Sequence, residues 1–398
     1  MEDLLFKSIE SVASSEIAFC RYITGNDTGK TGSHQSGFYI PKEAARLLFN
    51  NPVFKGENKD RMVKIKWQDE LYTDSRFIYY GCGTRNEFRI TRFGKNFPWL
   101  DDERVGDLMI IAQKEVDNYE AWVLSKDSDI DGFLDYFNIS PDCTNRIIDK
   151  TSAISPGEKM KHLLSQFISD KNSFPKTSEM ALAAEKCYNM ANGITDTDIL
   201  TSPDNILLKW IDSEYSLFQM LEEKLYLPII NANFGGVAEF IRLANEMLNR
   251  RKSRAGKSLE LHLAAIFDAA SLIYEEQIVT EDNKRPDFVF PSALSYHDFL
   301  FPADLLVMLA AKTTCKDRWR QVINEANRIP EKHLFTLQQA ISSNQLKEMH
   351  DEHVKLVVPQ KYIHNYPKEY QSEIMDLSSF VTFVKEKQKR IPHVYLQK

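Results

Sequence analysis

The sequence lacks paired cysteines and long apolar runs. Its five cysteines, at positions 20, 82, 143, 187 and 315, are scattered, odd in number and without CxxC or Cys/His zinc spacing. No apolar run approaches the ~20 residues of a membrane span, and the acidic N-terminus lacks the basic start of a secretory signal. We therefore expect reduced thiols, no membrane partner and a cytoplasmic location, and we exclude a disulfide scaffold.

Basic residues are fewer than acidic ones, 50 Lys and Arg against 57 Asp and Glu. The net charge is −7, which as a global value argues against a DNA-binding protein. The distribution differs from the total, because residues 21–97 contain 14 Lys and Arg against 8 Asp and Glu, whereas residues 98–170 contain 7 against 15. The positive N-terminal segment suits contacts with phosphates.

The stretch from Arg285 to Glu325 carries the candidate chemistry. A short apolar strand follows Asp287, and a second, fully apolar strand over 305–311 ends at Lys312. Carboxylates hold hard divalent cations, and an ammonium group stabilises developing negative charge. An Asp and a Lys at neighbouring strand ends therefore indicate a metal-dependent phosphodiesterase.

One acid of the usual nuclease pattern is missing. The pattern has Asp or Glu two residues before the Lys, and Ala310 stands there. We assign the second metal-ligand role to Glu325, in a helix expected to run from Cys315 through Glu325. Glu260 is a further acid, for which an ordinary helix-surface position is the commoner explanation. The alternative is that Asp287, Lys312 and Glu325 share no site.

Lys316, Asp317 and Arg318 form a compact set of donor, acceptor and donor. Lys and Arg pair with guanine in the major groove, and Asp accepts from cytosine N4. The tripeptide could read two adjacent C·G pairs. Its commoner explanation, taken alone, is the solvated start of a helix.

Other reactive groups fit less well. The Gly-Lys-Ser at 256–258 lacks the earlier glycine of a phosphate loop, because Arg251 stands there. We interpret the basic cluster 250–257 as a phosphate-contacting patch at a helix N-terminus. Cys315 has no His close in sequence to activate it. Metal-assisted attack by water needs neither Tyr296 nor His297 as a nucleophile.

The pattern of elements predicts two domains, 1–172 and 173–398. Many short alternating segments predict a small barrel or partly closed sheet in the first, and residues 126–172 are expected to be its tail and a linker. Strands alternating with helices predict an α/β second domain. Within the first, Arg85, Glu87 and Arg89 are expected on one face of a strand, where they either read bases or form surface ion pairs.

Several segments closely resemble the EcoRII-type restriction endonucleases. They are NDTGKTGSHQSGFYIP (26–41), TRNEFRITRFG (84–94), NRRKSRAGKSLELHL (249–263), PDFVFPS (286–292), AKTTCKDRWRQ (311–321), HLFTLQ (333–338) and VKLVVP (354–359). The resemblance covers both ends of the chain and is weakest over 126–208. It implies a mainly-β pseudobarrel DNA-binding domain followed by an α/β restriction-endonuclease-like PD-(D/E)xK domain.

The same resemblance implies a function. It is that of a bacterial, Mg²⁺-dependent homodimeric type IIE enzyme that cuts double-stranded DNA at a C/G-rich site, CCWGG, once a second copy occupies the N-terminal domain. Asp287, Lys312 and Glu325 fall on its catalytic positions and Lys316, Asp317 and Arg318 on its base-reading tripeptide. His34, Tyr39, Arg85, Glu87 and Arg89 fall on the effector-binding arms. A cognate DNA cytosine methyltransferase is expected in the host.

Two other functions remain open from the residues. Ala310 is compatible with a non-catalytic DNA-binding regulator that keeps a degenerate nuclease fold. A structure-specific nuclease, such as a junction resolvase, would use the same metal chemistry but would not need two base-reading sets.

Overall fold

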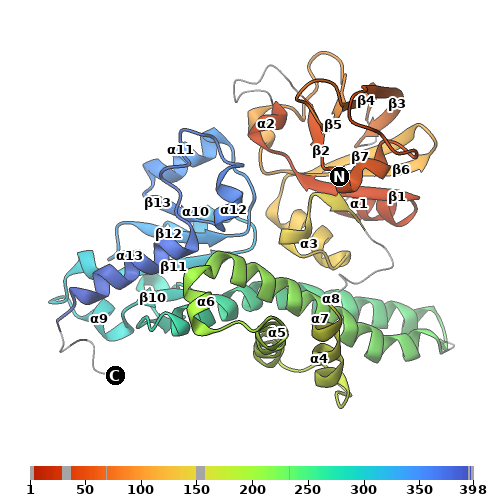
Figure 1. Cartoon of the computed structure of the whole chain (residues 1–398). Helices are drawn as coiled ribbons and strands as arrows, with labels where there is room; N and C mark the ends of the chain where they lie inside the picture. The colour runs from red at the N-terminus through yellow and green to blue at the C-terminus, as the bar shows by residue number, and fades with distance from the viewer. Residues whose placement is uncertain are drawn as a thin grey trace. The chain divides into compact units, whose positions relative to one another are not determined.

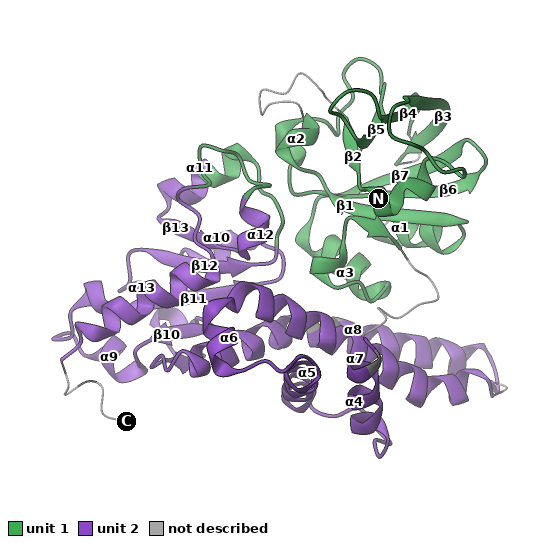
Figure 2. Ribbon diagram, in the orientation of Figure 1, with its two compact units in different colours: residues 1–151, 338–346, 364–371 green, residues 152–337, 347–363, 372–398 purple. Residues whose placement is uncertain are grey.

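The computed structural model describes residues 4–28, 37–68, 70–148, 157–232, 234–392 and 395. They form two compact units (Figure 2). Unit 1 comprises residues 1–151, 338–346 and 364–371, and unit 2 comprises residues 152–337, 347–363 and 372–398. Over the described ranges, no helix is both long enough and apolar enough to cross a membrane.

Unit 1 is built on a mixed eight-stranded sheet in the order β2-β5-β4-β3-β7-β6-β1-β8 (Figure 1). Neighbouring strands are antiparallel except for β3 and β7. The pseudobarrel closure of this sheet stays a prediction. The elements are α1 Leu4–Ala13, β1 Ile17–Tyr22, α2 Gly25–Thr28, β2 Phe38–Ile40, β3 Lys59–Trp67, β4 Leu71–Tyr80, β5 Glu87–Thr91, β6 Leu108–Glu115, β7 Asn118–Leu124, α3 Asp127–Tyr136 and β8 Arg146–Ile147.

The core of unit 1 follows from alternation along these strands. Residues at every second position of β3 and β4 are buried, as expected for a sheet with one covered face. Trp67 is fully buried, stacks on Trp99 at 5.5 Å between ring centroids, and packs against Phe38. These aromatic contacts hold β2 and β3 to the segment that follows β5.

Unit 2 is a five-stranded mixed sheet, β13-β12-β11-β10-β9, together with long helices. β11, β12 and β13 are parallel, and β10 runs antiparallel to β11. The elements are α4 Glu158–Ile168, α5 Thr177–Asn192, α6 Asp196–Thr201, α7 Pro203–Ile230, α8 Val237–Ala269, β9 Glu275–Glu276, β10 Phe288–Phe290, α9 Ala293–His297, β11 Val307–Lys312, α10 Trp319–Val322, β12 Lys332–Thr336, α11 Ser343–Asp351, β13 Val354–Val357, α12 Gln360–Ile363 and α13 Leu377–Lys389.

Helices α8 and α13 meet over strand β10. Phe267 of α8 lies 5.2 Å from Phe288 and 5.4 Å from Phe290, and Phe380 of α13 lies 5.9 Å from Phe290, between ring centroids. Both strand residues are buried. This packing fixes β10, and with it the position of Asp287 just before the strand.

Residues 126–172, expected to be the tail of the first domain and a linker, contain two helices, and the second of them was not expected in a linker. α3 buries Ile130, Phe133 and Leu134 in unit 1, and α4 buries Met160 and Leu164 against α5 and α7 in unit 2. The apolar residues of these two helices are separated by Asp, Ser and Lys. Their helical periodicity is therefore weak in the sequence. The domain boundary at 172–173 stays a prediction.

The basic cluster 250–257 does not lie at a helix N-terminus, because α8 runs through it without a break. Arg251 pairs with Glu222 through two contacts of 2.8 and 2.7 Å. Arg254 is buried, with its guanidinium over the rings of Tyr215 and Phe218. These cations bind α8 to α7, so the expected phosphate-contacting patch was wrong in its placement.

A buried ionic network joins three helices of unit 2. His262 of α8 contacts Glu185 of α5 at 2.6 Å through Nδ1 and Glu214 of α7 at 2.8 Å through Nε2. Burial alone would lower the pKa of His262, but the two carboxylates raise it to about 9. Glu214 also accepts from Ser258. The imidazolium thus compensates two carboxylates that are largely buried.

We expect His262→Gln to lower the free energy of unfolding by about 3–5 kcal/mol at pH 6, because it leaves buried carboxylates uncompensated. The folded-state pKa of His262 is raised, so its stabilisation is fully present below its ordinary pKa. It is lost as pH rises through about 9. Urea denaturation of both proteins across pH 6–10 measures this.

The matched control is His350→Gln, whose exposed partner is Glu373 at 3.0 Å. That change should cost less than about 1 kcal/mol. Equal losses for the two variants, or a difference at His262 that does not shrink with rising pH, would refute the role of the imidazolium charge.

Candidate active site and DNA-reading segments

Asp287 and Lys312 meet at one end of the β10–β11 pair. Lys312 Nζ donates to Asp287 Oδ2 at 2.9 Å, and the same oxygen accepts from the backbone N–H of Ala311 at 2.7 Å. Asp287 is buried, and Lys312 is half-buried. The spacing of 25 residues therefore does bring these two predicted groups together.

Glu325 lies near this pair, but not on a helix. α10 ends at Val322, so the helix expected to continue through Glu325 was wrong, and the residue occupies a bend. Burial raises the pKa of Glu325 to about 7, with Lys312 lowering it and Asp287 raising it further. These mutual effects place the three predicted catalytic groups in one electrostatic neighbourhood.

Gln277 is a site residue that the sequence analysis missed. Its Nε2 donates to Asp287 Oδ1 at 2.9 Å and lies 3.5 Å from Glu260 Oε2. Glu260 also pairs with Lys257 at 2.8 Å, one helical turn away. The carboxylate of Glu260 is therefore linked to the Asp287 site through one amide. A lone Gln ten residues before an Asp carries no sequence signal of this link.

The carboxylates of Asp287 and Glu325 are the groups that could hold Mg²⁺. Glu325 Oε2 is buried and makes no hydrogen bond among the described residues, as a carboxylate oxygen meant for a cation would. No cluster of three or more His, Cys, Asp or Glu suited to a metal occurs in the part of the chain that is described. Mg²⁺ commonly uses only one or two carboxylates and keeps its waters. Asp287 and Glu325 fit that requirement.

The tripeptide Lys316–Arg318 forms a turn directly before α10. Asp317 is exposed, Arg318 is half-buried and donates to Thr314 Oγ1 at 3.0 Å, and Lys316 is buried. The three residues thus lie in one turn, four to six residues beyond Lys312. Their role in reading bases stays a prediction.

In unit 1, three of the predicted effector residues, Tyr39, Glu87 and Arg89, lie on two adjacent strands. Tyr39 of β2 is the register partner of Arg89 of β5, and Arg89 Nε lies 3.5 Å from Glu87 Oε1. Arg85 was expected on the same strand but precedes it, with its guanidinium 5.4 Å from the ring centroid of Tyr80. His34 falls outside the described residues.

A buried ion pair supports this edge of unit 1. Arg21 and Asp27 make contacts of 3.0 and 2.9 Å, and both are nearly fully buried. Asp27 also accepts from the backbone N–H of Tyr39 at 3.0 Å, and Arg21 donates to the carbonyl of Tyr39. The pair therefore fixes the backbone that presents the Tyr39 ring.

The other reactive residues have structural surroundings. Cys315 is fully buried. Tyr296 is buried and donates to Glu281, and burial together with that carboxylate raises the pKa of the phenol, which disfavours the phenolate of a nucleophile. The treatment of Tyr296 as structural thus agrees with its contacts.

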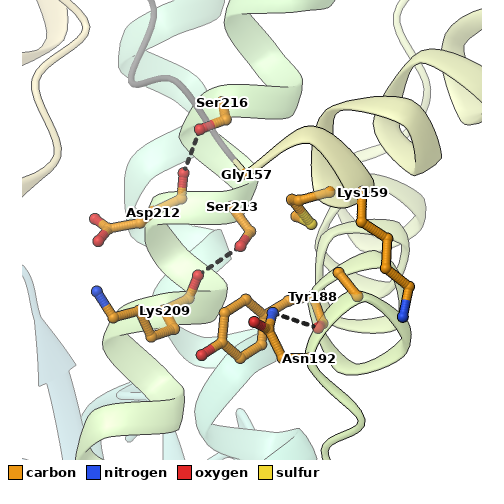
Figure 3. A pocket seen from close by; sticks show the side chains of 10 residues that line it. Gly157, Lys159, Tyr188, Asn192, Lys209, Asp212, Ser213 and Ser216 are labelled. Carbon is orange, nitrogen blue, oxygen red and sulfur yellow. Dashed lines mark hydrogen bonds between the residues drawn. The ribbon is translucent and has the colours of Figure 1, made fainter.

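A separate cavity of about 380 Å³ lies among α4, α5 and α7 (Figure 3). Ser213 and Ser216, which line it, donate to carbonyls of their own helix, and Asn192 donates to the carbonyl of Tyr188. None of the predicted catalytic or base-reading residues lines this cavity. The cavity is therefore not part of the candidate active site.

Both units match family models of one class of protein, the type II restriction endonucleases, which are site-specific deoxyribonucleases. The family model for the EcoRII C-terminal domain matches residues 218–381, and that for the N-terminal domain of restriction endonuclease EcoRII matches residues 12–145. The chain is 36% identical over 393 residues to the type II restriction enzyme EcoRII of Escherichia coli, covering 94% of this chain and 95% of that protein. The chain belongs to the EcoRII family of type II restriction endonucleases.

Two solved structures of restriction endonucleases are also similar in fold. Metal-depleted Ecl18kI in complex with uncleaved, modified DNA is 19% identical, with a TM-score of 0.46 over 59% of this chain and 85% of that one. The PspGI–substrate DNA complex is 16% identical, with a TM-score of 0.45 over 56% of this chain and 97% of that one.

Proposed function

We propose that this restriction endonuclease hydrolyses both strands of DNA at CCWGG with Mg²⁺, and that a second copy of the site bound by unit 1 activates it. One observation carries the chemistry: Lys312 Nζ lies 2.9 Å from Asp287 Oδ2, and a buried oxygen of Glu325 has no hydrogen-bond partner within the described part of the chain. Family membership supports the choice of DNA as substrate.

Each residue has a distinct task in this proposal. Asp287 and Glu325 are the metal ligands, and Lys312 holds the attacking water and stabilises the charge that develops on the phosphate. Gln277 and the Ala311 amide orient the two oxygens of Asp287. Bound Mg²⁺ supplies polarisation of the phosphoryl group and a lowered pKa for a bound water.

Sequence is read in two places. Lys316, Asp317 and Arg318 contact the C·G pairs of the site being cut. Tyr39, Arg85, Glu87 and Arg89, with His34, contact the effector copy. The exposure of Asp317 and Arg85 and the rigid surroundings of Tyr39 support these assignments.

The proposal includes a homodimer, supported by apolar side chains at the end of α7 and the start of α8. These two helices run side by side (Figure 1). At least 44% of each side chain in this set is exposed: Leu227, Ile229, Ile230, Val237, Phe240 and Ile241. Exposed apolar groups gathered in this way mark association surfaces. A DNA cytosine methyltransferase in the host completes the set of expected partners.

The rival function is a regulator that binds DNA without cutting it. It predicts a site that has lost an essential group, as Ala310 suggests. Two features favour the nuclease: the contact between Asp287 and Lys312, and the buried Glu325 oxygen that lacks a hydrogen-bond partner among the described residues. A site that had lost catalysis would not require either of them.

Plasmid digestion tests the function directly. Plasmids with none, one or several CCWGG sites are incubated with Mg²⁺ or with EDTA. We expect discrete fragments only from the multi-site plasmid and only with Mg²⁺. A specific gel shift of CCWGG duplexes without cleavage of any plasmid would support the regulator instead.

Lys312→Ala should lower the cleavage rate by at least about 100-fold, the usual effect of removing one preorganised charge-stabilising donor. Binding to a CCWGG duplex in EDTA should remain, because Lys312 is not among the base-reading residues. Single-turnover cleavage and gel shift measure the two properties. The control is Lys355→Ala, which removes an exposed lysine of β13 that pairs with Glu331. Undiminished cleavage by Lys312→Ala would overturn the catalytic assignment.

Arg89→Ala should weaken binding of the effector copy by about 1–3 kcal/mol, if the guanidinium contacts a guanine in bidentate fashion. Activation by an added CCWGG oligonucleotide, titrated on a single-site plasmid, reports this affinity. Arg76→Ala removes a cation of the same sheet that pairs with Asp60, and it should leave activation unchanged. Equal effects from both arginines would indicate non-specific charge attraction rather than reading by Arg89.

A further inference from the structure

Glu325 reaches the site from a segment without regular secondary structure. Residues 323–329 follow α10 as turns and bends, and Ala326 has a φ of 48°, a conformation that costs a non-glycine residue energy. The nuclease pattern would place this acid at Ala310, on a strand whose backbone is already fixed. A side chain on an irregular segment needs other contacts to be held as well.

Lys332 of β12 supplies two of these contacts. It is buried, and its Nζ donates to the carbonyls of Ala326 at 2.6 Å and Ile329 at 2.5 Å. Burying an ammonium is costly unless it is hydrogen-bonded. A lysine kept in this position ties both ends of the turn after Glu325 to the sheet.

Tyr296 and Glu281 hold the same turn from the other side. Tyr296, on α9, is buried, and its hydroxyl donates to both carboxylate oxygens of Glu281 at 2.6 and 2.9 Å. Glu281 Oε2 accepts from the backbone N–H of Asn327 at 3.1 Å, and the Tyr296 oxygen lies 3.4 Å from the N–H of Arg328. Because Glu281 is exposed, it acts through these hydrogen bonds more than through its charge.

Two further contacts complete the enclosure of the segment. Lys284 Nζ donates to the carbonyl of Asn324 at 3.2 Å, on the other side of Glu325. The guanidinium of Arg328 donates to the carbonyls of Ser295 at 3.1 Å and Phe301 at 2.5 Å. Backbone groups from 324 to 329 are thus bound by side chains of three separate segments.

We propose that Lys332 and Tyr296, with Glu281 as their link to the turn, are positioning residues that hold Glu325 beside Asp287 and Lys312. They replace the rigidity that a strand would give to an acid at position 310. The inference rests on the proposed role of Glu325 as a metal ligand. Residues that orient a ligand in this way commonly change metal affinity 10–100-fold when mutated.

The test measures metal affinity without cleavage. Mn²⁺ is titrated into the DNA-free protein, and free Mn²⁺ is followed by electron paramagnetic resonance. Lys332→Met removes both donors while keeping the length of the side chain, and Tyr296→Phe removes only one hydroxyl from a packed ring. We expect each to weaken Mn²⁺ binding by about 10-fold, and to raise the Mg²⁺ concentration for half-maximal cleavage similarly. Binding of CCWGG duplex in EDTA should be unchanged.

Tyr226→Phe is the matched control. Tyr226 is also buried, and its hydroxyl contacts Glu246 at 3.3 Å and Arg250 at 3.1 Å, away from the 324–329 segment. It should leave Mn²⁺ affinity unchanged. If Lys332→Met does not fold, as judged by circular dichroism, Tyr296→Phe alone decides the test.

Glu325→Gln separates the inference from the proposed function. If it weakens Mn²⁺ binding while Tyr296→Phe matches the Tyr226→Phe control, the positioning role is wrong and the metal site stands. If Glu325→Gln itself leaves Mn²⁺ binding unchanged, the assignment of Glu325 as a ligand fails, and the inference fails with it.

Discussion

The candidate active site depends on the register between two short strands, β10 and β11. β10 and β11 are antiparallel with Phe288 opposite Leu309, and this pairing brings the carboxylate of Asp287 to the N–H of Ala311 and the ammonium of Lys312. A shift by one residue would turn every side chain to the other face, and would separate the two charges. Phe267 and Phe380 form an aromatic layer over Phe288 and Phe290, which holds this register. The packing of the core therefore also sets the geometry of the candidate site.

Helix α8 connects features that appear unrelated in the sequence. Its first residues, Val237, Phe240 and Ile241, are exposed and apolar, and its middle pairs Arg251 with Glu222. Further along, Lys257 pairs with Glu260, and Gln277 links Glu260 to Asp287. The buried imidazolium of His262 then fixes the helix to α5 and α7. One continuous helix thus runs from the surface proposed for dimerisation to the edge of the site proposed for catalysis.

The sequence was sufficient to place candidate groups that lie at the ends of apolar strands. Strand β11 and its terminal Lys312, and the short strand after Asp287, follow from apolar runs and their ends. Residues held by contacts distant in sequence could not be found in this way. Glu325 was predicted as a ligand from the missing acid and from resemblance, a role that stays a prediction. The helix expected to carry it was wrong, because its turn is stabilised by Lys332, Tyr296 and Glu281 and not by helical hydrogen bonds. Gln277 and His262 carry no pattern at all.

The roles of the charged residues also could not be predicted from short stretches of sequence. The basic cluster 250–257 has the composition of a phosphate-binding patch, yet Arg251 and Arg254 are used inside the protein, one on a carboxylate and one on two aromatic rings. The turn Lys316–Arg318 has two cations and one acid, so its net positive charge is small and composition alone would not select it. Attraction to phosphates falls steeply with salt, so the role proposed for this turn depends on contacts with the bases and not on the total charge.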